Sequence, residues 1–135
     1  MSPGKVYLLD ANLILRFLLD DHPDFNSRAR AFFRALHDGE KNALVLDCVL
    51  AECVYVLEKF YRVQRREIEE KLSAILQFAG IIGNDSRQLG DALRLYARKK
   101  VDIVDAILIS KSAPDRPIAS WDDDIRKLTR NLEKI

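Results

Sequence analysis

The stretch Val6-Tyr7-Leu8-Leu9-Asp10 decides the fold, because a continuous apolar run ends abruptly at a carboxylate. Apolar runs without polar alternation are typical of parallel strands that are buried on both faces. The acid that follows can cap a helix, so a strand that leads directly into a helix is predicted here. Three further apolar runs are each followed by an aspartate, and they lie at residues 43–46, 81–82 and 117–119.

Helical periodicity fills the segments between these predicted strands. The predicted helices cover residues 25–36, 48–61, 67–78, 86–98, 102–112 and 123–132. Strands that alternate with helices along a whole chain predict an α/β sandwich built around a parallel sheet. With 135 residues and no linker or repeat, we expect one domain over residues 1–135.

Composition excludes several classes of protein. Hydrophobic residues make up 48% and charged residues 32%, which argues against a disordered or collagen-like chain. No apolar run approaches the ~18 residues of a membrane span, and the first residues lack a signal-peptide core, so we expect a cytoplasmic protein without membrane contact. The formal net charge of +1 is too small for nucleic-acid binding by global attraction. Cys48 and Cys53 are expected to be reduced, buried and too far apart to bond.

Four acids occupy the positions where a functional site is expected. Asp10 and Asp122 follow predicted strands, Glu52 lies early in the helix after the second strand, and Asp105 lies in the first turn of the helix that opens at Asp102. In an open parallel sheet, the loops at the carboxyl ends of the strands border one crevice. We therefore expect the four carboxylates to share that crevice, provided that the helix of Asp105 packs beside the first strand.

Carboxylates that converge without matching cations repel one another, at about 4 kcal/mol per close pair at an effective dielectric near 20. A divalent cation removes that cost, and Mg²⁺ and Mn²⁺ choose oxygen ligands. With no histidine or cysteine among these acids, zinc is not expected. Such a site would support metal-assisted hydrolysis of a phosphodiester.

Each acid also has an ordinary structural interpretation. Asp102 can be a helix N-cap, and Asp105 can be a first-turn acid that the helix dipole favours. Asp122 can simply begin a helix, and Glu52 can lie on a solvated helix face. Asp10 is the hardest to explain in this way, because a charge directly after a buried strand needs a partner.

The motifs around these acids resemble the PIN domain family, and within it the small VapC-type toxins. Four segments carry the likeness, at residues 6–14, 50–57, 101–108 and 118–122, and their order and spacing are more specific than any one of them. The resemblance implies a three-layer sandwich whose parallel sheet has four to five strands. It also implies that Asp10, Glu52, Asp105 and Asp122 are the acidic metal-binding and catalytic residues, and that Asn12 and Ser120 support them, with Asp102 beside them.

The resemblance further implies an endoribonuclease that depends on Mg²⁺ or Mn²⁺ and acts as the toxin of a type II toxin–antitoxin pair. Its expected partners are an RNA substrate, a cognate antitoxin and a second copy of the chain. The helices at residues 25–36 and 48–61 carry many large apolar residues, which also predicts a homodimer. The alternative is a PIN-like scaffold that binds RNA or protein without cleavage. A phospho-receiver is disfavoured, because it requires a lysine at the end of the last strand. A dehalogenase-like phosphatase is disfavoured as well, because it requires an aspartate at position 12, where this chain has Asn12.

Two basic runs remain open to two interpretations. Lys59, Arg62, Arg65 and Arg66 surround Phe60 and Tyr61, a combination that can neutralise phosphates and stack on bases. The same residues can instead be the solvated end of a helix, where the dipole favours cations. The run from Arg94 to Lys100 has the same ambiguity.

Overall fold

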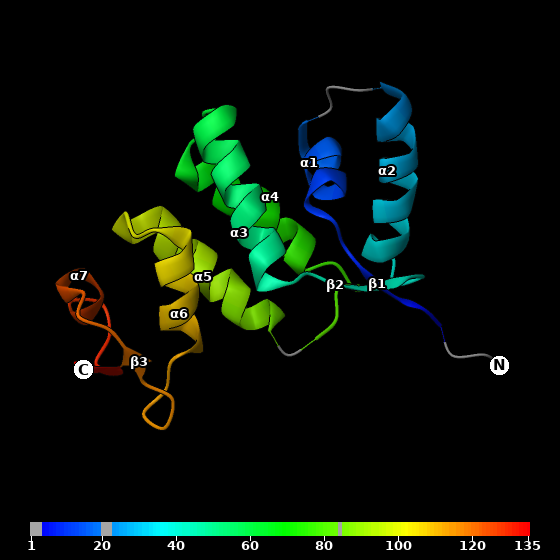
Figure 1. The fold of residues 1–135 in the computed structure, drawn as a ribbon. Helices are drawn as coiled ribbons and strands as arrows, with labels where there is room; N and C mark the ends of the chain where they lie inside the picture. The colour runs from blue at the N-terminus through cyan, green and yellow to red at the C-terminus, as the bar shows by residue number, and fades with distance from the viewer. Residues whose placement is uncertain (1–3, 20–22, 84) are drawn as a thin grey trace.

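The computed structural model describes residues 4–19, 23–83 and 85–135 (Figure 1). Helices dominate, and four short strands make the fold an α/β one. In chain order the elements are β1 (Val6–Leu8), α1 (Ala11–Leu19), α2 (Pro23–His37), β2 (Asn42–Leu44), α3 (Asp47–Tyr55), the π-helical turn η1 (Val56–Phe60), α4 (Arg65–Leu76), α5 (Ser86–Lys99), α6 (Ile103–Lys111), β3 (Ile118–Ala119), α7 (Asp123–Arg126) and β4 (Leu132–Glu133).

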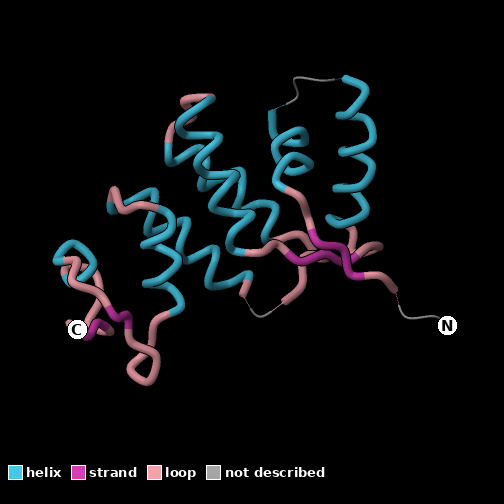
Figure 2. Tube along the Cα trace, viewed as in Figure 1, coloured by secondary structure: helices cyan, strands magenta, loops and turns pink. Residues whose placement is uncertain are grey.

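The described strands form two separate parallel pairs, where the sequence predicts one sheet of four to five strands. β1 runs parallel to β2 with Tyr7 opposite Ala43, and a parallel bridge from Ala43 to Ile81 extends this pair. β3 runs parallel to β4. Figure 2 shows the two pairs apart from each other, with the second pair near the C-terminus. Both pairs of named strands are parallel, as the sequence predicts. The described strands do not, however, join into one larger sheet.

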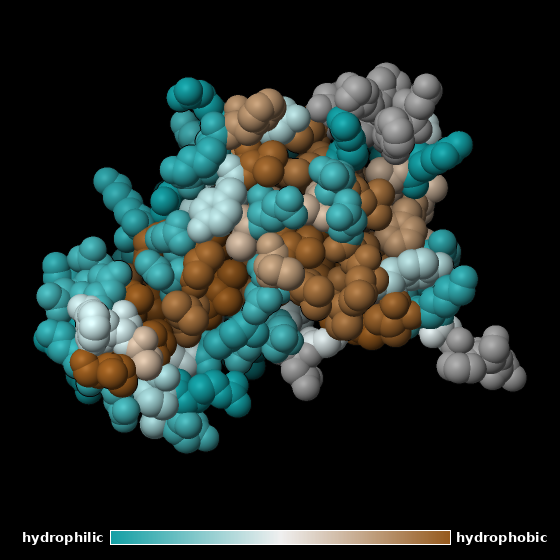
Figure 3. Space-filling model, in the orientation of Figure 1, coloured by the Kyte–Doolittle hydropathy of each residue, from teal (hydrophilic) through white to brown (hydrophobic). Residues whose placement is uncertain are grey.

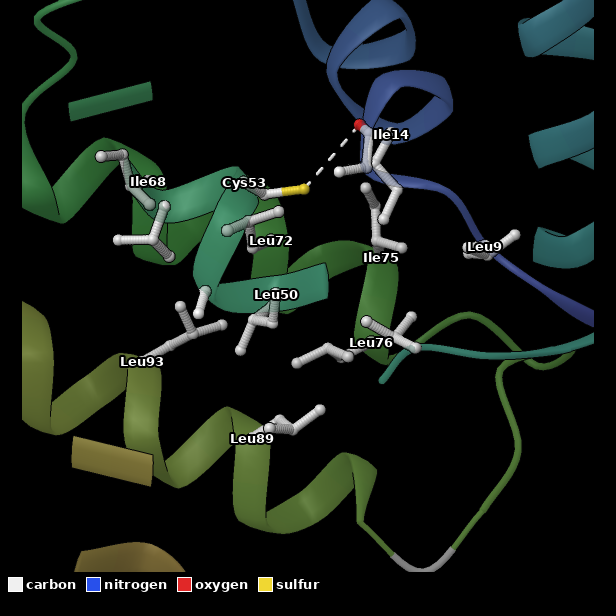
Figure 4. Packing of buried hydrophobic residues seen from close by; sticks show 14 of the residues in the cluster. Leu9, Ile14, Leu50, Cys53, Ile68, Leu72, Ile75, Leu76, Leu89 and Leu93 are labelled. Carbon is white, nitrogen blue, oxygen red and sulfur yellow. Dashed lines mark hydrogen bonds between the residues drawn. The ribbon is translucent and has the colours of Figure 1, made fainter. Parts of the chain in front are cut away.

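The core lies among the helices α1 to α6, and Figure 4 shows the part of it between α1, α3, α4 and α5. The helix α5 shows why its sequence packs into this core. Four apolar side chains recur on one face of the helix, and all are buried: Leu89, Ala92, Leu93 and Tyr96. Each leucine or isoleucine buried in this way contributes about 1.5–3 kcal/mol to stability. The apolar side chains of the predicted helices at residues 25–36 and 48–61 that lie in this core are therefore used within one chain, and they offer no dimer surface.

Several predicted helices are confirmed with small shifts of their ends, namely those of α2, α4, α5 and α6. Two predictions need correction and one needs completion. A helix is predicted to follow Asp10 without a stated range, and α1 gives that range as Ala11–Leu19. The predicted helix at 48–61 changes at Val56 from α- to π-helical geometry. The predicted helix at 123–132 ends at Arg126, because the following residues pair with β3, as in the bond from the Ile118 amide to the Asn131 carbonyl.

The sequence predicts that both cysteines are buried, but only one of them is. Cys53 is buried in the core, but Cys48 is exposed on the opposite side of α3, and both thiols are free. No helix in the described ranges has the length and apolarity that crossing a membrane requires.

Candidate functional site

Asp10 links the end of β1 to the start of α1. Its Oδ2 accepts a hydrogen bond from the Asn12 amide at 3.1 Å, and its carbonyl accepts from the amides of Leu13 and Ile14. The carboxylate therefore caps α1 at its positive end, which explains why a charge can directly follow the strand. Asp10 and Asn12 remain exposed, so their side chains are accessible to a ligand.

Glu52 lies on α3, and the charges of Glu52 and Asp10 both act on the buried thiol of Cys53. Burial raises the pKa of Cys53 to about 12, with further contributions from the carboxylates of Glu52 and then Asp10. A thiol with such a pKa stays protonated at neutral pH. Its Sγ lies 3.9 Å from the Ala11 carbonyl at the start of α1. The α1–α3 packing thus places Asp10 and Glu52 in one neighbourhood.

Asp102 caps α6, as predicted, and also binds a tyrosine on another helix. Its Oδ2 accepts from the Val104 amide at 3.1 Å, and the Tyr55 hydroxyl lies 3.0 Å from the same oxygen. Burial, together with this hydrogen bond and the Asp102 charge, raises the pKa of Tyr55. Tyr55 follows Glu52 by three residues on α3, so it connects the Glu52 face of α3 to the start of α6.

Asp105 and Asp122 lie within electrostatic reach of each other. Burial, and then the charges of Asp102 and Asp122, raise the pKa of Asp105. Asp122 caps α7 by accepting from the Asp124 amide at 2.8 Å, and its own amide donates to the Ser120 Oγ at 3.0 Å. Ser120 therefore shapes the turn that presents Asp122.

A pocket of about 340 Å³ brings acids and lysines together at the start of α6. Its acidic wall contains Asp102, Asp105 and Asp122, and Lys99, Lys100 and Lys127 also line it. Carboxylate oxygens are the ligands that hard divalent cations prefer, and lysines neutralise phosphate oxygens. The pocket thus combines oxygen donors, the ligand type that a hard cation prefers, with cations that suit a phosphate.

The predicted site residues fall into two groups. Asp10, Asn12 and Glu52 lie around the junction of β1, α1 and α3, whereas Asp105 and Asp122 lie with Asp102 near α6 and α7 (Figure 1). Over residues 4–19, 23–83 and 85–135, no three acidic, histidine or cysteine side chains are arranged to hold a metal ion. The donors fit Mg²⁺ or Mn²⁺ in their chemistry, since all are oxygens.

Two residues beside this site, Tyr55 and Lys127, have no role predicted from the sequence. For Tyr55, its three-residue spacing from Glu52 is the only signal that the sequence offers. Lys99 and Lys100 belong to the basic run for which phosphate contact is one of two interpretations, and both line the acidic pocket.

Arg65 has neither of the two roles considered for its basic run, which are contact with RNA and a solvated helix end. Its Nη1 donates to the carbonyls of Tyr96 and Val101 at 2.9 and 2.8 Å, and its Nε lies 3.4 Å from Glu58. It is a structural residue that fixes the connection before Asp102.

The fold and site together define an α/β protein with carboxylates placed after its parallel strands. The sequence matches the PIN domain family over residues 7–129, which is nearly its whole length, and the chain belongs to that family. PIN domains are generally metal-dependent nucleases, so a nuclease function follows for this chain at that general level. No curated protein shows significant similarity to the sequence.

Proposed function

We propose that this chain is a single-domain, metal-dependent endoribonuclease that hydrolyses phosphodiester bonds of RNA. The observation that carries the proposal is the pocket in which Asp105 is crowded by Asp102 and Asp122 beside three lysines. Clustered carboxylates next to phosphate-binding cations suit a site for a divalent cation and a nucleic-acid backbone. Membership of a family of nucleases supports the same assignment.

In this proposal Asp10, Glu52, Asp105 and Asp122 are the residues that would hold Mg²⁺ or Mn²⁺. When bound, the cation would lower the pKa of a coordinated water and offset charge on the phosphate in the transition state. Lys99, Lys100 and Lys127 would hold the phosphate oxygens of the RNA. Asn12 and Ser120 would keep the first and last of the four acids in place through the turns that they form.

For one site to contain all four acids, we propose that β3 pairs with the free edge of β1. In the described part of the chain, β1 has a partner on one side only, and so does β3. The order Ile81, β2, β1, β3, β4 would give the five-stranded parallel sheet that the sequence predicts. Neighbouring parallel strands end at the same edge, so Asp10 and Asp122 would then become neighbours.

Exposed apolar side chains on β1 support this rearrangement. Val6 is 48% exposed and Leu8 is 65% exposed, which is unusual for strand residues of their size. Figure 3 shows apolar surface across the middle of one face of the molecule. A strand pair that covered this surface would bury it and satisfy the free backbone groups of β1.

Hydrogen exchange measures this pairing directly. Amides of residues 6–8 should exchange more slowly after Mn²⁺ is added, because the cation would draw Asp10 and Asp122 together and close the edge of β1. Unchanged exchange at residues 6–8 in saturating Mn²⁺ would argue against the five-stranded sheet.

The biological role proposed is that of a cytoplasmic toxin that a cognate antitoxin restrains, as the VapC-like motifs suggest. A homodimer is also proposed, now through α6, where Val104 and Leu108 are both 43% exposed and lie one turn apart. Light scattering at tens of micromolar tests this association, and a monomer mass would exclude it at that concentration.

A scaffold that binds RNA or protein without cleavage is the second candidate. The observation that favours it is the separation of the acids into two groups in the part of the chain that the structure describes. RNA cleavage separates the two candidates. A scaffold would bind RNA but leave it intact in Mn²⁺, whereas a nuclease would cut it and lose this activity in EDTA.

The matched variants for this assay are Asp105→Asn and Asp91→Asn. Both remove one carboxylate, but Asp91 lies on the exposed face of α5, where it pairs with Arg94. We expect Asp105→Asn to lower the cleavage rate at least ~100-fold and Asp91→Asn to leave it unchanged. Equal cleavage by the two variants would refute the nuclease assignment.

A further inference from the structure

A second pocket, of about 280 Å³, lies between α1 and the α3–η1 segment. Its walls are apolar where Leu15 and Val56 line it, and polar where Asn12, Arg16 and Glu52 line it. Asn12 and Glu52 are also residues of the proposed nuclease site, so the pocket adjoins that site. Its volume is at the lower end of the ~300–1,000 Å³ typical of ligand pockets, which suits one planar ring rather than a polypeptide segment.

Two aromatic side chains form the remaining wall of this pocket. Phe60 is 76% exposed and Tyr61 is 40% exposed, and their ring centroids lie 5.0 Å apart. A phenylalanine exposed to this extent gains little from folding, since its apolar surface stays in water. Exposed aromatic rings beside polar groups are typical of surfaces that stack on the bases of single-stranded nucleic acid.

The backbone holds these rings in an unusual conformation. Phe60 ends the π-helical turn, whose bond from the Tyr61 amide to the Val56 carbonyl is 3.2 Å long. Arg62 follows with a φ of +54°, which costs energy for a residue other than glycine. π-Helical turns frequently lie at functional sites. The local chain is therefore shaped to present Phe60 and Tyr61 rather than to bury them.

The polar groups of the pocket match the edge of a nucleobase. The Asn12 side-chain amide can both donate and accept, Glu52 can accept, and Arg16 adds a cation. Arg62 and Arg66 are exposed beyond the aromatic pair, where they can neutralise the phosphates of a strand that continues past it. Stacking faces, base-edge partners and flanking cations together are the features that recognise unpaired RNA.

We infer that this pocket binds one unstacked base of single-stranded RNA, with Phe60 as its stacking surface. The inference rests on the proposed nuclease function, because it places the base beside the phosphate that the acids would cleave. The bound base must be unpaired, since a base inside a double helix could not enter the pocket.

The test measures binding of a fluorescent single-stranded RNA, by anisotropy in Mn²⁺, to protein that carries Asp105→Asn to prevent cleavage. In this background Phe60→Ala should weaken binding about 5- to 100-fold, which corresponds to the loss of one base–aromatic stack. Phe60→Trp should retain the affinity, and Phe60→Leu, which keeps apolar bulk without the ring, should not. Because Phe60 is largely exposed, thermal melting should show all three variants folded.

A second RNA, with stable abasic nucleotides in place of its bases, isolates the stacking contribution. Phe60→Ala should not change the binding of this RNA. An equal loss for both RNAs, or no loss for either, would overturn the inference. If Phe60→Ala leaves RNA binding intact but changes the oligomeric mass, the pocket is a protein interface and the inference is likewise wrong.

Failure of the nuclease proposal has a different signature. In that case the protein with Phe60 intact would bind neither RNA, or would bind RNA that the wild-type chain never cleaves. RNA binding by Asp105→Asn together with a base-independent effect of Phe60→Ala would instead overturn the pocket assignment alone.

Discussion

At the scale of single residues, Glu58 shows how one carboxylate is kept ionised inside the molecule. The hydroxyl of buried Tyr96 donates to Glu58, and this hydrogen bond lowers the pKa of Glu58 against the effect of burial. Lys59, 3.2 Å away, and Arg65 lower it further. In return, burial and then the Glu58 charge raise the pKa of Tyr96, so the hydroxyl remains a donor.

Glu58→Gln should therefore destabilise the protein in a pH-dependent way. A carboxylate with a lowered folded-state pKa contributes stability above its unfolded-state pKa and loses it as pH falls through the folded-state value. At pH 7 we expect a loss of about 1–2 kcal/mol in the free energy of unfolding, as for a hydrogen bond to a charged group. Urea unfolding of both proteins at pH 7 and at about pH 3 checks this. A difference of the same size at both pH values would show that the Glu58 charge is irrelevant.

Some residue-scale features could be predicted from the sequence and others could not. The capping role of Asp102 follows from its place before an apolar helix, and the structure confirms it. The hydrogen bond from Tyr55 to Asp102 spans 47 residues of chain, so no local pattern predicts it. Arg65 is similar, because its partners Tyr96 and Val101 are distant in sequence and its neighbours suggest a solvated basic run.

At the scale of elements, Arg65 joins the start of α4 to the α5–α6 connection. Its guanidinium lies 4.2 Å from the centre of the Tyr96 ring and donates to two carbonyls at the end of α5 and beyond. These carbonyls follow the last helical hydrogen bonds of α5, where an unpaired acceptor would be costly. Arg65 thus helps to fix the backbone just before Asp102, together with the Tyr55 hydroxyl and the N-cap hydrogen bond of Asp102 itself.

Arg65→Ala should lower the free energy of unfolding by about 2–3 kcal/mol, because it leaves two carbonyls and Glu58 without their shared donor. Arg65→Lys should recover less than half of that loss, since an ammonium cannot stack on Tyr96 and reach both carbonyls at once. Urea denaturation measures both values. A fully stable lysine variant would mean that charge alone matters at this position.

Gly80 lies in close contact with the backbone of the segment from Leu36 to Lys41. A Cβ placed there would lie 2.0 Å from the Lys41 carbonyl oxygen and 2.7 Å from the Leu36 carbonyl oxygen. The Gly80 carbonyl also accepts from the Ala43 amide at 2.8 Å, next to the bridge that Ile81 makes with β2. Backbone on both sides leaves no room for even a methyl group.

Gly80→Ala should destabilise the protein by at least ~2 kcal/mol, because the added methyl group must displace backbone. Gly90→Ala is the matched control. It lies within α5 with no atom closer than 4.0 Å to its added Cβ, so it should stabilise the helix by about 0.5–1 kcal/mol. Thermal melting of the two variants should shift in opposite directions, and a shift in the same direction would contradict this account of Gly80.

Whether a helix or strand can be predicted from the sequence depends on whether local or distant interactions stabilise it. The helix α5 has a wide apolar stripe and α6 has an N-cap, so both are visible in the sequence. The helix α1 is amphipathic too, because Ala11, Ile14 and Leu15 are buried at helical spacing while Asn12 is exposed, so its range could have been predicted from the same pattern. The last segment looks helical, but strand pairing at β4 overrides its local propensity.

At the scale of the whole molecule, the sequence selects candidate site residues but does not predict how they assemble. Asp10, Glu52, Asp105 and Asp122 stand out through their places after strands and at helix starts. Whether they meet depends on the order of the strands, which periodicity does not encode. In the structure Asp10 and Glu52 are near each other, as are Asp105 and Asp122, and the two strand pairs decide how far the groups are from one another.

The central claim is that acids from both strand pairs hold one cation, and a Mn²⁺ titration by calorimetry tests it most directly. Asp10→Asn and Asp122→Asn should each weaken Mn²⁺ binding at least ~10-fold, because each would remove a ligand of the same ion. Asp123→Asn removes an equal charge from α7, where Asp123 lies near Arg126 and Lys134, and should bind Mn²⁺ like the wild type. Wild-type affinity in Asp10→Asn would contradict the claim.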